Sequence, residues 1–338
     1  MPSIAKHPHV ELQAALKPAF PLDARRLTVL TALVLAMIQA RSVVLYTLKN
    51  YVQLPGTRAM RYQRLLRFVQ FTVPEGLFTQ FVLSVLPPGE LWLILDRTNW
   101  KLGKQDINIL LLSATWKGVS FPLLWTLLPH GGASGQQDRI ALLKRFLLSC
   151  GERKVAGVMA DREFLGGAWF TFLAEHSIAP CIRLRRDVRV NGIPVWACFC
   201  QLQIGELRVW HRRMNVQGVR LRVLATRNAA GEILYLAYRG WPRQNLRRYA
   251  LRWQAETLHS CLKSRGFHLE DTGLTHAARV STLLMITSLA FVWACLTGEL
   301  HAASHGIKRK AHRQPAVSVF RHGLDHLQDL LLHPSTAS

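Results

Sequence analysis

Acidic residues are scarce in this sequence. The 338 residues include 20 Asp plus Glu against 43 Lys plus Arg, which leaves a formal net charge of +23. The excess of bases is spread along the whole chain, and such a distribution indicates a long polyanionic partner. Nucleic acid is the first candidate for that partner, and a membrane surface is the rival.

Apolar runs that would clearly cross a membrane are lacking. Residues 27–40 form too short a run, and residues 280–297 barely reach the required length while including several serines and threonines. We therefore predict that both stretches form buried helices, and we expect no membrane partner.

Cysteine pairs at two-residue spacing with matching histidines are also missing, so neither a zinc cage nor a disulfide framework is indicated. The six cysteines are expected to be reduced and mostly buried, and the 14 histidines are scattered. Residues 1–13 lack the apolar core of a signal peptide, which predicts a cytoplasmic protein.

The first 88 residues have a helical pattern. Residues 24–46 are long and apolar, and residues 58–71 place arginines between apolar side chains, as in a basic amphipathic helix. Arg61 and Arg64 either face DNA phosphates or belong to an ordinary solvated helix face, and the sequence leaves both interpretations open. Pro87, Pro88 and Gly89 then mark a boundary, so we predict an all-helical DNA-binding domain over 1–88.

Strands and helices alternate over residues 89–186. Apolar runs at 91–95, 107–116 and 119–128 predict a three-stranded meander, and Ser134 or Asp138 is expected to cap a helix that reaches residue 150. A strand at 155–160, a helix at 168–175 and a strand at 180–184 complete the order. This pattern predicts an α/β core with a mixed sheet.

Residues 187–240 have a different sequence pattern from the residues before them. Short alternating strands are separated by turn signals at Asn191-Gly192, Gln217-Gly218 and Ala230-Gly231, which predicts a β-rich insertion. Its basic face consists of Arg208, Arg212, Arg213, Arg220, Arg222 and Arg227. Helix returns over 241–300 as the second part of the core, and 301–338 form a basic tail.

Three carboxylates have a common context. Asp96 and Asp161 each end a predicted buried strand, although aspartate is also common there as a turn former. Glu256 lies on a later helix over 246–263, and Glu163 is an alternative third member. In so basic a chain, converging carboxylates imply a hard divalent cation, and two Mg²⁺ ions would support phosphoryl transfer on DNA.

The helix over 246–263 places four polar side chains on one stripe. Tyr249, Arg252, Glu256 and Lys263 fall within roughly 60° of one another at about 3.6 residues per turn, while apolar residues gather on another side. Taken alone, the stripe favours a solvated basic face that includes one incidental glutamate, and the rest of the chain must decide between that interpretation and a site.

These residues resemble the YREK signature of the insertion-sequence-four family of DDE transposases. The match is Tyr249, Arg252, Glu256 and Lys263, and LILDRTNW at 93–100 and MADREF at 159–164 are similar to the family's two aspartate segments. Three motifs in the expected order, on the expected strand, strand and helix, make the resemblance specific.

The resemblance implies a ribonuclease-H-like core, a β-rich insertion before the glutamate helix, and cut-and-paste transposition. Asp96, Asp161 and Glu256 are then metal ligands for two Mg²⁺ ions, with Mn²⁺ as a substitute. Tyr249, Arg252 and Lys263 are expected to grip DNA near the cleaved phosphate, with Trp253 stacking on a displaced base.

The expected partners are double-stranded DNA, as terminal inverted repeats and target, and a second copy of the chain on that DNA. The expected location is the cytoplasm, at the nucleoid. A stand-alone nuclease of the same fold and an inactive DNA-binding remnant of a mobile element are the alternatives.

Overall fold

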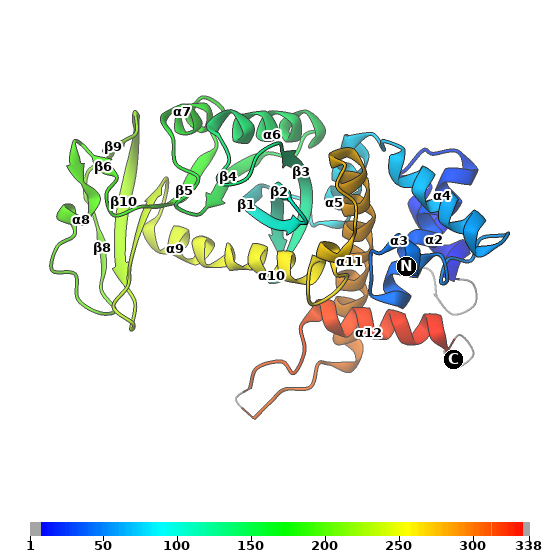
Figure 1. The fold of residues 1–338 in the computed structure, drawn as a ribbon. Coiled ribbons are helices and arrows are strands. Elements are labelled where there is room, and N and C mark those ends of the chain that lie inside the picture. Colours follow the sequence, from blue (N-terminus) through cyan, green and yellow to red (C-terminus); the bar gives the residue numbers. More distant parts are fainter. Residues whose placement is uncertain (1–7, 312, 334–338) are drawn as a thin grey trace. The chain divides into compact units, whose positions relative to one another are not determined.

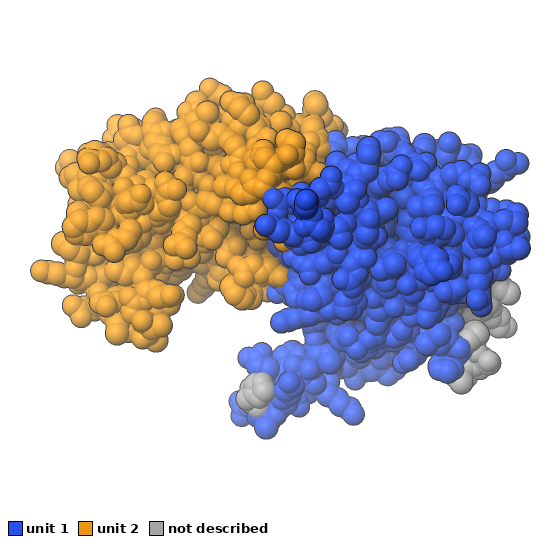
Figure 2. All heavy atoms as spheres, viewed as in Figure 1, with its two compact units in different colours: residues 1–85, 100–107, 257–338 blue, residues 86–99, 108–256 orange. Residues whose placement is uncertain are grey.

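The computed structural model describes residues 8–311 and 313–333. The chain divides into two compact units (Figure 2): unit 1 comprises Met1–Val85, Trp100–Ile107 and Thr257–Ser338, and unit 2 comprises Leu86–Asn99 and Asn108–Glu256. Both units are built from segments distant in sequence, so the boundaries expected at residues 88, 186, 240 and 300 stay predictions.

A large mixed sheet forms unit 2, except for the tip of its first hairpin, which belongs to unit 1. Its strands follow the order β3-β2-β1-β4-β5-β11-β10-β9-β6-β7, with β8 paired to β10. The first five strands are β1 (Leu91–Leu102), β2 (Gln105–Trp116), β3 (Val119–Leu128), β4 (Val155–Ala160) and β5 (Ala179–Leu184). β4 runs parallel to both β1 and β5, whereas β2 and β3 are antiparallel. The predicted mixed α/β core is confirmed, and β1 extends seven residues beyond its predicted end at Leu95.

Helices cover both faces of this sheet (Figure 1). α6 (Gln136–Ser149) and α7 (Gly167–Glu175) lie on one face, and α9 (Pro242–Leu251) packs beneath β4, β5 and β11 on the other. Of the two predicted capping residues of α6, Asp138 does cap the helix from its first turn, because its carboxylate accepts from the N–H of the N-cap residue Gly135 at 2.7 Å. The Ser134 hydroxyl instead accepts from the Arg139 side chain at 2.9 Å.

Arg139 fixes the loop that follows β4. Its buried guanidinium donates to the carbonyls of Ser134 (2.5 Å), Glu163 (3.0 Å) and Leu165 (2.8 Å). Burial lowers the pKa of Arg139, and the Glu163 carboxylate acts against that shift. The loop that begins at Asp161 is therefore tied to the first turn of α6.

Gly157 in β4 allows a close approach of Trp92 in β1. A Cβ at position 157 would lie 2.4 Å from the Trp92 ring and 2.6 Å from the Ala179 carbonyl oxygen. The Arg248 guanidinium of α9 lies 4.0 Å from the centroid of the same Trp92 ring. Trp92 thus lies between the sheet and α9 only because residue 157 has no side chain.

Residues 187–240 are rich in short strands, as the sequence predicted, and the last of these strands extend the core sheet. Its elements are β6 (Arg189–Val190), β7 (Ile193–Pro194), α8 (Val195–Cys198), β8 (Leu207–Val209), β9 (Met214–Val216), β10 (Val219–Arg227) and β11 (Ile233–Tyr238). The turns at Asn191-Gly192 and Gln217-Gly218 have positive φ at both residues, as two-residue hairpin turns require. β11 pairs antiparallel with β5, which the sequence did not predict.

Unit 1 is helical in the part that the structure describes, apart from the β-hairpin tip. Its helices are α1 (Pro8–Leu16), α2 (Ala24–Ala40), α3 (Leu45–Leu48), α4 (Arg58–Gln70), α5 (Glu75–Val85), the part of α10 (Trp253–Leu262) from Thr257 onward, η1 (Leu269–Asp271), α11 (Ala277–His305) and α12 (Val319–Leu332). The single helix predicted over 24–46 was wrong beyond Ala40, because Arg41 adopts a left-handed conformation with φ of 47° and ends α2.

The long apolar helix α11 lies in the core of unit 1. By length and composition it is able to cross a membrane, but 83% of its most apolar window is buried within the protein. Its Thr287 hydroxyl donates to the Leu283 carbonyl of the same helix at 2.8 Å. The predictions of buried helices at 27–40 and 280–297 are confirmed.

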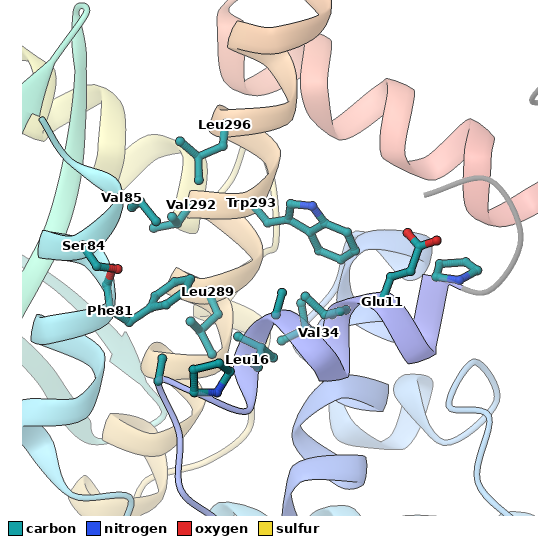
Figure 3. A pocket seen from close by; sticks show the side chains of 15 residues that line it. Glu11, Leu16, Val34, Phe81, Ser84, Val85, Leu289, Val292, Trp293 and Leu296 are labelled. Carbon is teal, nitrogen blue, oxygen red and sulfur yellow. The ribbon is translucent and has the colours of Figure 1, made fainter. Parts of the chain in front are cut away.

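An apolar hollow of about 330 Å³ lies among α1, α2, α5 and α11 (Figure 3). Leu16, Val34, Phe81 and Leu289 line it, and Glu11 is the one ionisable side chain among its lining residues. Because its lining is almost entirely apolar, this hollow lacks the side chains needed for acid–base catalysis or metal binding.

Candidate active site

Asp96 and Asp161 occupy neighbouring positions on adjacent strands of the sheet. In the parallel β1–β4 ladder, Leu95 is in register with Ala160, so the two aspartates are the next residues along neighbouring strands. Adjacent strands lie about 4.8 Å apart. The sequence placed both residues at strand ends, and β4 does end there, whereas β1 continues past Asp96 to Leu102.

Glu256 is carried by α10 (Trp253–Leu262) rather than by one uninterrupted helix. The predicted helix over 246–263 is broken at Arg252, which caps α9 and precedes α10. The Arg252 N–H donates to the Tyr249 carbonyl at 3.0 Å, and the Ala255 N–H donates to the Arg252 carbonyl at 2.9 Å. These bonds span three residues, so the backbone tightens where the site residues lie.

Arg252 joins two of the three carboxylates. Its Nη2 lies 2.8 Å from Glu256 Oε1 and its Nη1 lies 3.8 Å from Asp96 Oδ2, with only 11% of the arginine side chain exposed. Burial alone would lower the pKa of Arg252, but the neighbouring Tyr249, Glu256, Asp96 and Asp161 together raise it above its usual value. One guanidinium therefore stands in the field of all three predicted carboxylates.

Asp161 has its own donors. The Tyr249 hydroxyl donates to Asp161 Oδ1 at 3.3 Å, and Arg183 Nη1 lies 3.9 Å from the same oxygen. Burial, followed by the charge of Asp161, raises the pKa of Tyr249 to about 12. The phenol is thus neutral at physiological pH and acts as a donor.

The three carboxylates fit a hard divalent cation by their chemistry, because carboxylate oxygens are the ligands that such ions prefer. Across residues 8–311 and 313–333, no three His, Cys, Asp or Glu side chains are gathered as a ready ligand set. Arg252 lies between Asp96 and Glu256 and provides the positive charge there. A cation at this site would compete with the guanidinium for the same oxygens.

Glu163, the alternative third carboxylate, pairs with Arg97 and not with Arg252. Both of its oxygens accept from Arg97, at 3.2 and 3.4 Å. Arg97 also donates to the side-chain oxygen of Asn108 at 3.0 Å, and Asn108 donates to the carbonyls of His130 and Gly132. The structure places Glu256, not Glu163, against Arg252.

Lys263 and Trp253 make none of the contacts described above around Arg252. Lys263 lies just beyond α10 in unit 1, where its Nζ is 2.5 Å from Glu270 Oε1 and 5.6 Å from the centroid of the Trp100 ring. Trp253 is 62% exposed in the first turn of α10. The predicted DNA contacts of these two residues remain predictions.

Arg61 and Arg64 both contact the loop before α4. Arg61 Nε donates to the Leu54 carbonyl at 2.7 Å, and Arg64 Nη1 donates to the Pro55 carbonyl at 2.9 Å. Arg64 also lines a hollow of about 660 Å³ together with Arg25, Arg26 and Arg67. The arginines of α4 thus support a loop and border a basic concavity.

A second basic hollow, of about 610 Å³, lies in unit 2 near Asp161. Its lining includes the five arginines Arg162, Arg183, Arg185, Arg186 and Arg227, with Trp196, Phe199 and Tyr235. Sequence reasoning singled out only Arg227 of these arginines. The available signal was the alternation Arg183, Leu184, Arg185, in which the two arginines share one face of β5 and its extension.

Comparison with known proteins places these residues within a described family. A family model described as "Transposase DDE domain" matches residues 88–293. No curated protein matches the chain in sequence. The solved structures that resemble it include the piggyBac transposase in a synaptic complex with hairpin DNA, at 12% identity and a TM-score of 0.48. That match covers 86% of this chain and 64% of the piggyBac chain, so this chain spans just under two thirds of that length.

Proposed function

We propose that this chain, which belongs to the transposase DDE domain family, is a DNA transposase that cuts transposon ends and joins them to target DNA. The carrying observation is the arrangement of Asp96, Asp161 and Glu256 around Arg252, all within the residues that the family model matches. The spacing of Tyr249, Arg252, Glu256 and Lys263 supports the insertion-sequence-four branch with its YREK signature.

The strand order β3-β2-β1-β4-β5, with β4 parallel to both neighbours, supports a ribonuclease-H-like core. The strands between β5 and α9 correspond to the proposed insertion, and α1 to α5 correspond to the proposed DNA-binding helices. We retain the domain limits 1–88, 89–186, 187–240, 241–300 and 301–338 as part of this proposal.

Asp96, Asp161 and Glu256 are the residues that would hold the metal, which we propose to be two Mg²⁺ ions, replaceable by Mn²⁺. Such ions activate the attacking oxygen and stabilise the leaving oxygen at a phosphodiester. The chain's own contribution is positional, because the sheet fixes the two aspartates as neighbours and α10 brings the glutamate to them.

The basic and hydroxyl groups at the site are proposed to hold DNA phosphates. With cations on the carboxylates, the guanidinium of Arg252 would be free to donate to phosphate oxygens, for which its forked donors are suited. The Tyr249 hydroxyl, neutral because its pKa is raised to about 12, remains a donor beside Asp161. Lys263 adds a point charge, and the exposed ring of Trp253 offers a stacking face for a displaced base.

The proposed partners are double-stranded DNA and a second copy of this chain. The net charge of +23 supports a polyanionic partner, and coordinated cutting of two ends requires at least two active sites on the DNA. We propose that the protein works in the cytoplasm, on the nucleoid.

Terminal-repeat oligonucleotides, taken from short inverted repeats flanking the coding sequence, provide the test. With Mg²⁺, the wild-type chain should cut the labelled end and join it to a target plasmid, whereas Asp96→Asn should do neither but still bind the duplex. Asp106→Asn, at an exposed aspartate of β2, is the matched control and should retain activity. Cutting without joining supports the nuclease alternative, and an active Asp96→Asn variant contradicts the assigned site.

A further inference from the structure

Two pairs of histidines lie at the end of α11 and along α12. His301 and His305 are four residues apart on α11, and His322 and His326 are four residues apart on α12. Side chains at this spacing project from the same face of a helix, and a histidine pair at this spacing is a common way for one helix to offer two metal ligands. Both pairs lie outside the residues that the family model matches.

A close crossing of the two helices, visible in Figure 1, brings the pairs together. A Cβ at Gly323 would lie 1.9 Å from the Ala294 carbonyl oxygen, and one at Gly298 would lie 2.1 Å from the Val319 carbonyl oxygen. The backbones are therefore in direct contact at these two glycines. His301 follows Gly298 by one helical turn, and His322 and His326 flank Gly323, so the crossing sets the imidazoles opposite one another.

The four rings form one cluster around His301. Its ring centroid is 4.3 Å from that of His305, 4.8 Å from that of His322 and 4.2 Å from that of His326. His301 Nδ1 lies 2.8 Å from His322 Nε2, a hydrogen bond in which one nitrogen must accept. At least one of these two imidazoles is consequently neutral, and neutral imidazole is the form that ligates metals.

The surroundings favour that neutral form. Burial, followed by the charges of the other histidines, lowers the pKa of His301, and burial together with His322 lowers the pKa of His326 against the opposing charge of Asp329. Asp325, the nearest acidic residue in sequence on α12, forms ion pairs with Arg41 and Arg321. The cluster is thus a set of imidazoles next to one acid, Asp325, that already has basic partners, and a second acid, Asp329, whose charge does not reverse the lowered pKa of His326.

We propose that His301, His305, His322 and His326 bind one transition-metal ion of the Zn²⁺ class, which clips α12 to α11. Imidazole nitrogens suit Zn²⁺, Ni²⁺ and Cu²⁺ and are poor ligands for Mg²⁺, so the site is chemically distinct from the carboxylates of unit 2. The His301 and His305 rings are stacked, the His326 and His322 rings are tilted against that of His301, and no three of these side chains form a ready ligand set as the structure describes them. Binding therefore turns the side chains about their own torsions and leaves the helix crossing in place.

Cobalt uptake by the full-length chain tests the proposal, because Co²⁺ in a four-nitrogen tetrahedral site absorbs visible light strongly and Co²⁺ bound to oxygens in octahedral sites does so weakly. Excess Mg²⁺ keeps the carboxylate site from binding Co²⁺. We expect one Co²⁺ per chain, displaced by one Zn²⁺, without the near-ultraviolet band of a thiolate ligand. A background of Cys198→Ser and Cys200→Ser removes the two least buried of the cysteines.

Ligand variants locate the ion. Loss of an outer partner of a metal ligand costs about 10–100-fold in affinity, so His301→Ala with His326→Ala, which removes two ligands, should weaken Zn²⁺ binding by at least about 100-fold. His276→Ala is the matched control, since His276 is the exposed N-cap of the same α11 helix, and it should leave affinity unchanged.

A stability readout covers the case in which the double variant folds poorly. Zn²⁺ should raise the Tm of the wild-type chain and of His276→Ala, but should leave the Tm of the milder variant His326→Gln nearly unchanged. The proposal is overturned if the wild-type chain takes up no Co²⁺ under excess Mg²⁺, if the double variant binds as tightly as wild type, or if the bound ion shows thiolate ligation. Because the readouts are uptake and Tm, none of these results depends on transposase activity.

Discussion

The two compact units treat their buried polar groups differently. In unit 2, Arg139 joins the start of α6 to the loop after β4, and Arg252 joins α10 to β1, so each guanidinium connects segments far apart in sequence. In unit 1, the buried hydroxyls of Thr31 and Thr287 donate to carbonyls of their own helices, and that of Thr282 donates to the distant Phe71 carbonyl at 3.2 Å, each through a single neutral bond. Charged networks that join several segments are sensitive to the loss of one member, whereas each of these hydroxyls makes one bond of modest energy. Unit 2, which contains the candidate site, therefore depends on charged networks between distant segments, whereas unit 1 depends mainly on apolar packing.

The largest effect should come from removing charge at the centre of the unit 2 network. Glu256→Gln keeps the shape of the side chain but removes the carboxylate that holds Arg252, and end cleavage should fall by at least roughly 10²–10³-fold, as when other preorganised charges are lost. Rates on labelled terminal-repeat DNA provide the measurement. Glu175→Gln, at the exposed end of α7, is the control. If Glu256→Gln cleaves DNA ends at the wild-type rate, the charged network of unit 2 is not needed for activity, and the contrast drawn between the two units fails.

Arg139→Leu should be the most damaging substitution for stability in unit 2. It leaves the carbonyls of Ser134, Glu163 and Leu165 without their donor inside the protein, and such losses at a buried charged group cost about 3–5 kcal/mol. Urea unfolding followed by near-ultraviolet circular dichroism measures the change. The exposed Arg213→Leu should shift stability by less than about 0.5 kcal/mol, and an equal effect of both variants would contradict this role for Arg139.

A single methyl group added at the α11–α12 crossing should lower the stability of unit 1. Gly323→Ala places a carbon 1.9 Å from the Ala294 carbonyl oxygen unless the helices separate, and overpacking of this kind costs about 1–3 kcal/mol. The expected result is a lower Tm with unchanged duplex cleavage under conditions where the variant stays folded. Ser304→Ala, at an exposed position of α11, should leave the Tm as it is. A Gly323→Ala variant with wild-type Tm would show that the crossing is not close-packed.

The smallest effect concerns the titration of Tyr249. Because its pKa is raised to about 12 from a usual value of 10.0, the folded state holds this proton more tightly than the unfolded state. That stabilising contribution is complete below pH 10 and is lost as the pH rises through 12. The difference in phenolate absorbance between wild type and Tyr249→Phe should therefore appear near pH 12. Its appearance near pH 10 would place Tyr249 in water, away from Asp161.

Strong local patterns predicted most of the core. Apolar runs between turn signals located β2 to β5, and the turns at Asn191-Gly192 and Gln217-Gly218 fell where positive φ is required. Local patterns do not encode pairing between distant strands, so the antiparallel pairing of β11 with β5 could not be derived. The ends of elements were less accurate, since Arg41 stops α2 by a left-handed conformation that nothing in its residue type demands.

The candidate site was predictable as a set of residue types but not as a set of contacts. Strand ends and helical spacing selected Asp96, Asp161, Tyr249, Arg252 and Glu256, which the structure brings together. Helical spacing also selected Lys263, but the break at Arg252 alters the stripe, and Lys263 pairs with Glu270. Arg97 was missed because its partner Glu163 lies on another segment and leaves no signal in the neighbouring sequence, and Arg183 was missed although its alternation with Leu184 and Arg185 was available.

The close contact at Gly157 limits which amino acids related chains can have at positions 157 and 92. The ring of Trp92 occupies the space that any side chain at 157 would need, and Arg248 of the helix leading to the site rests on that ring. A larger residue at 157 requires a smaller one at 92 and also a shift of the neighbouring strand, because a Cβ at 157 would lie 2.6 Å from the Ala179 carbonyl oxygen. Among related chains, position 157 should therefore stay glycine wherever position 92 is tryptophan, and a lineage that loses the indole also loses the surface on which Arg248 rests.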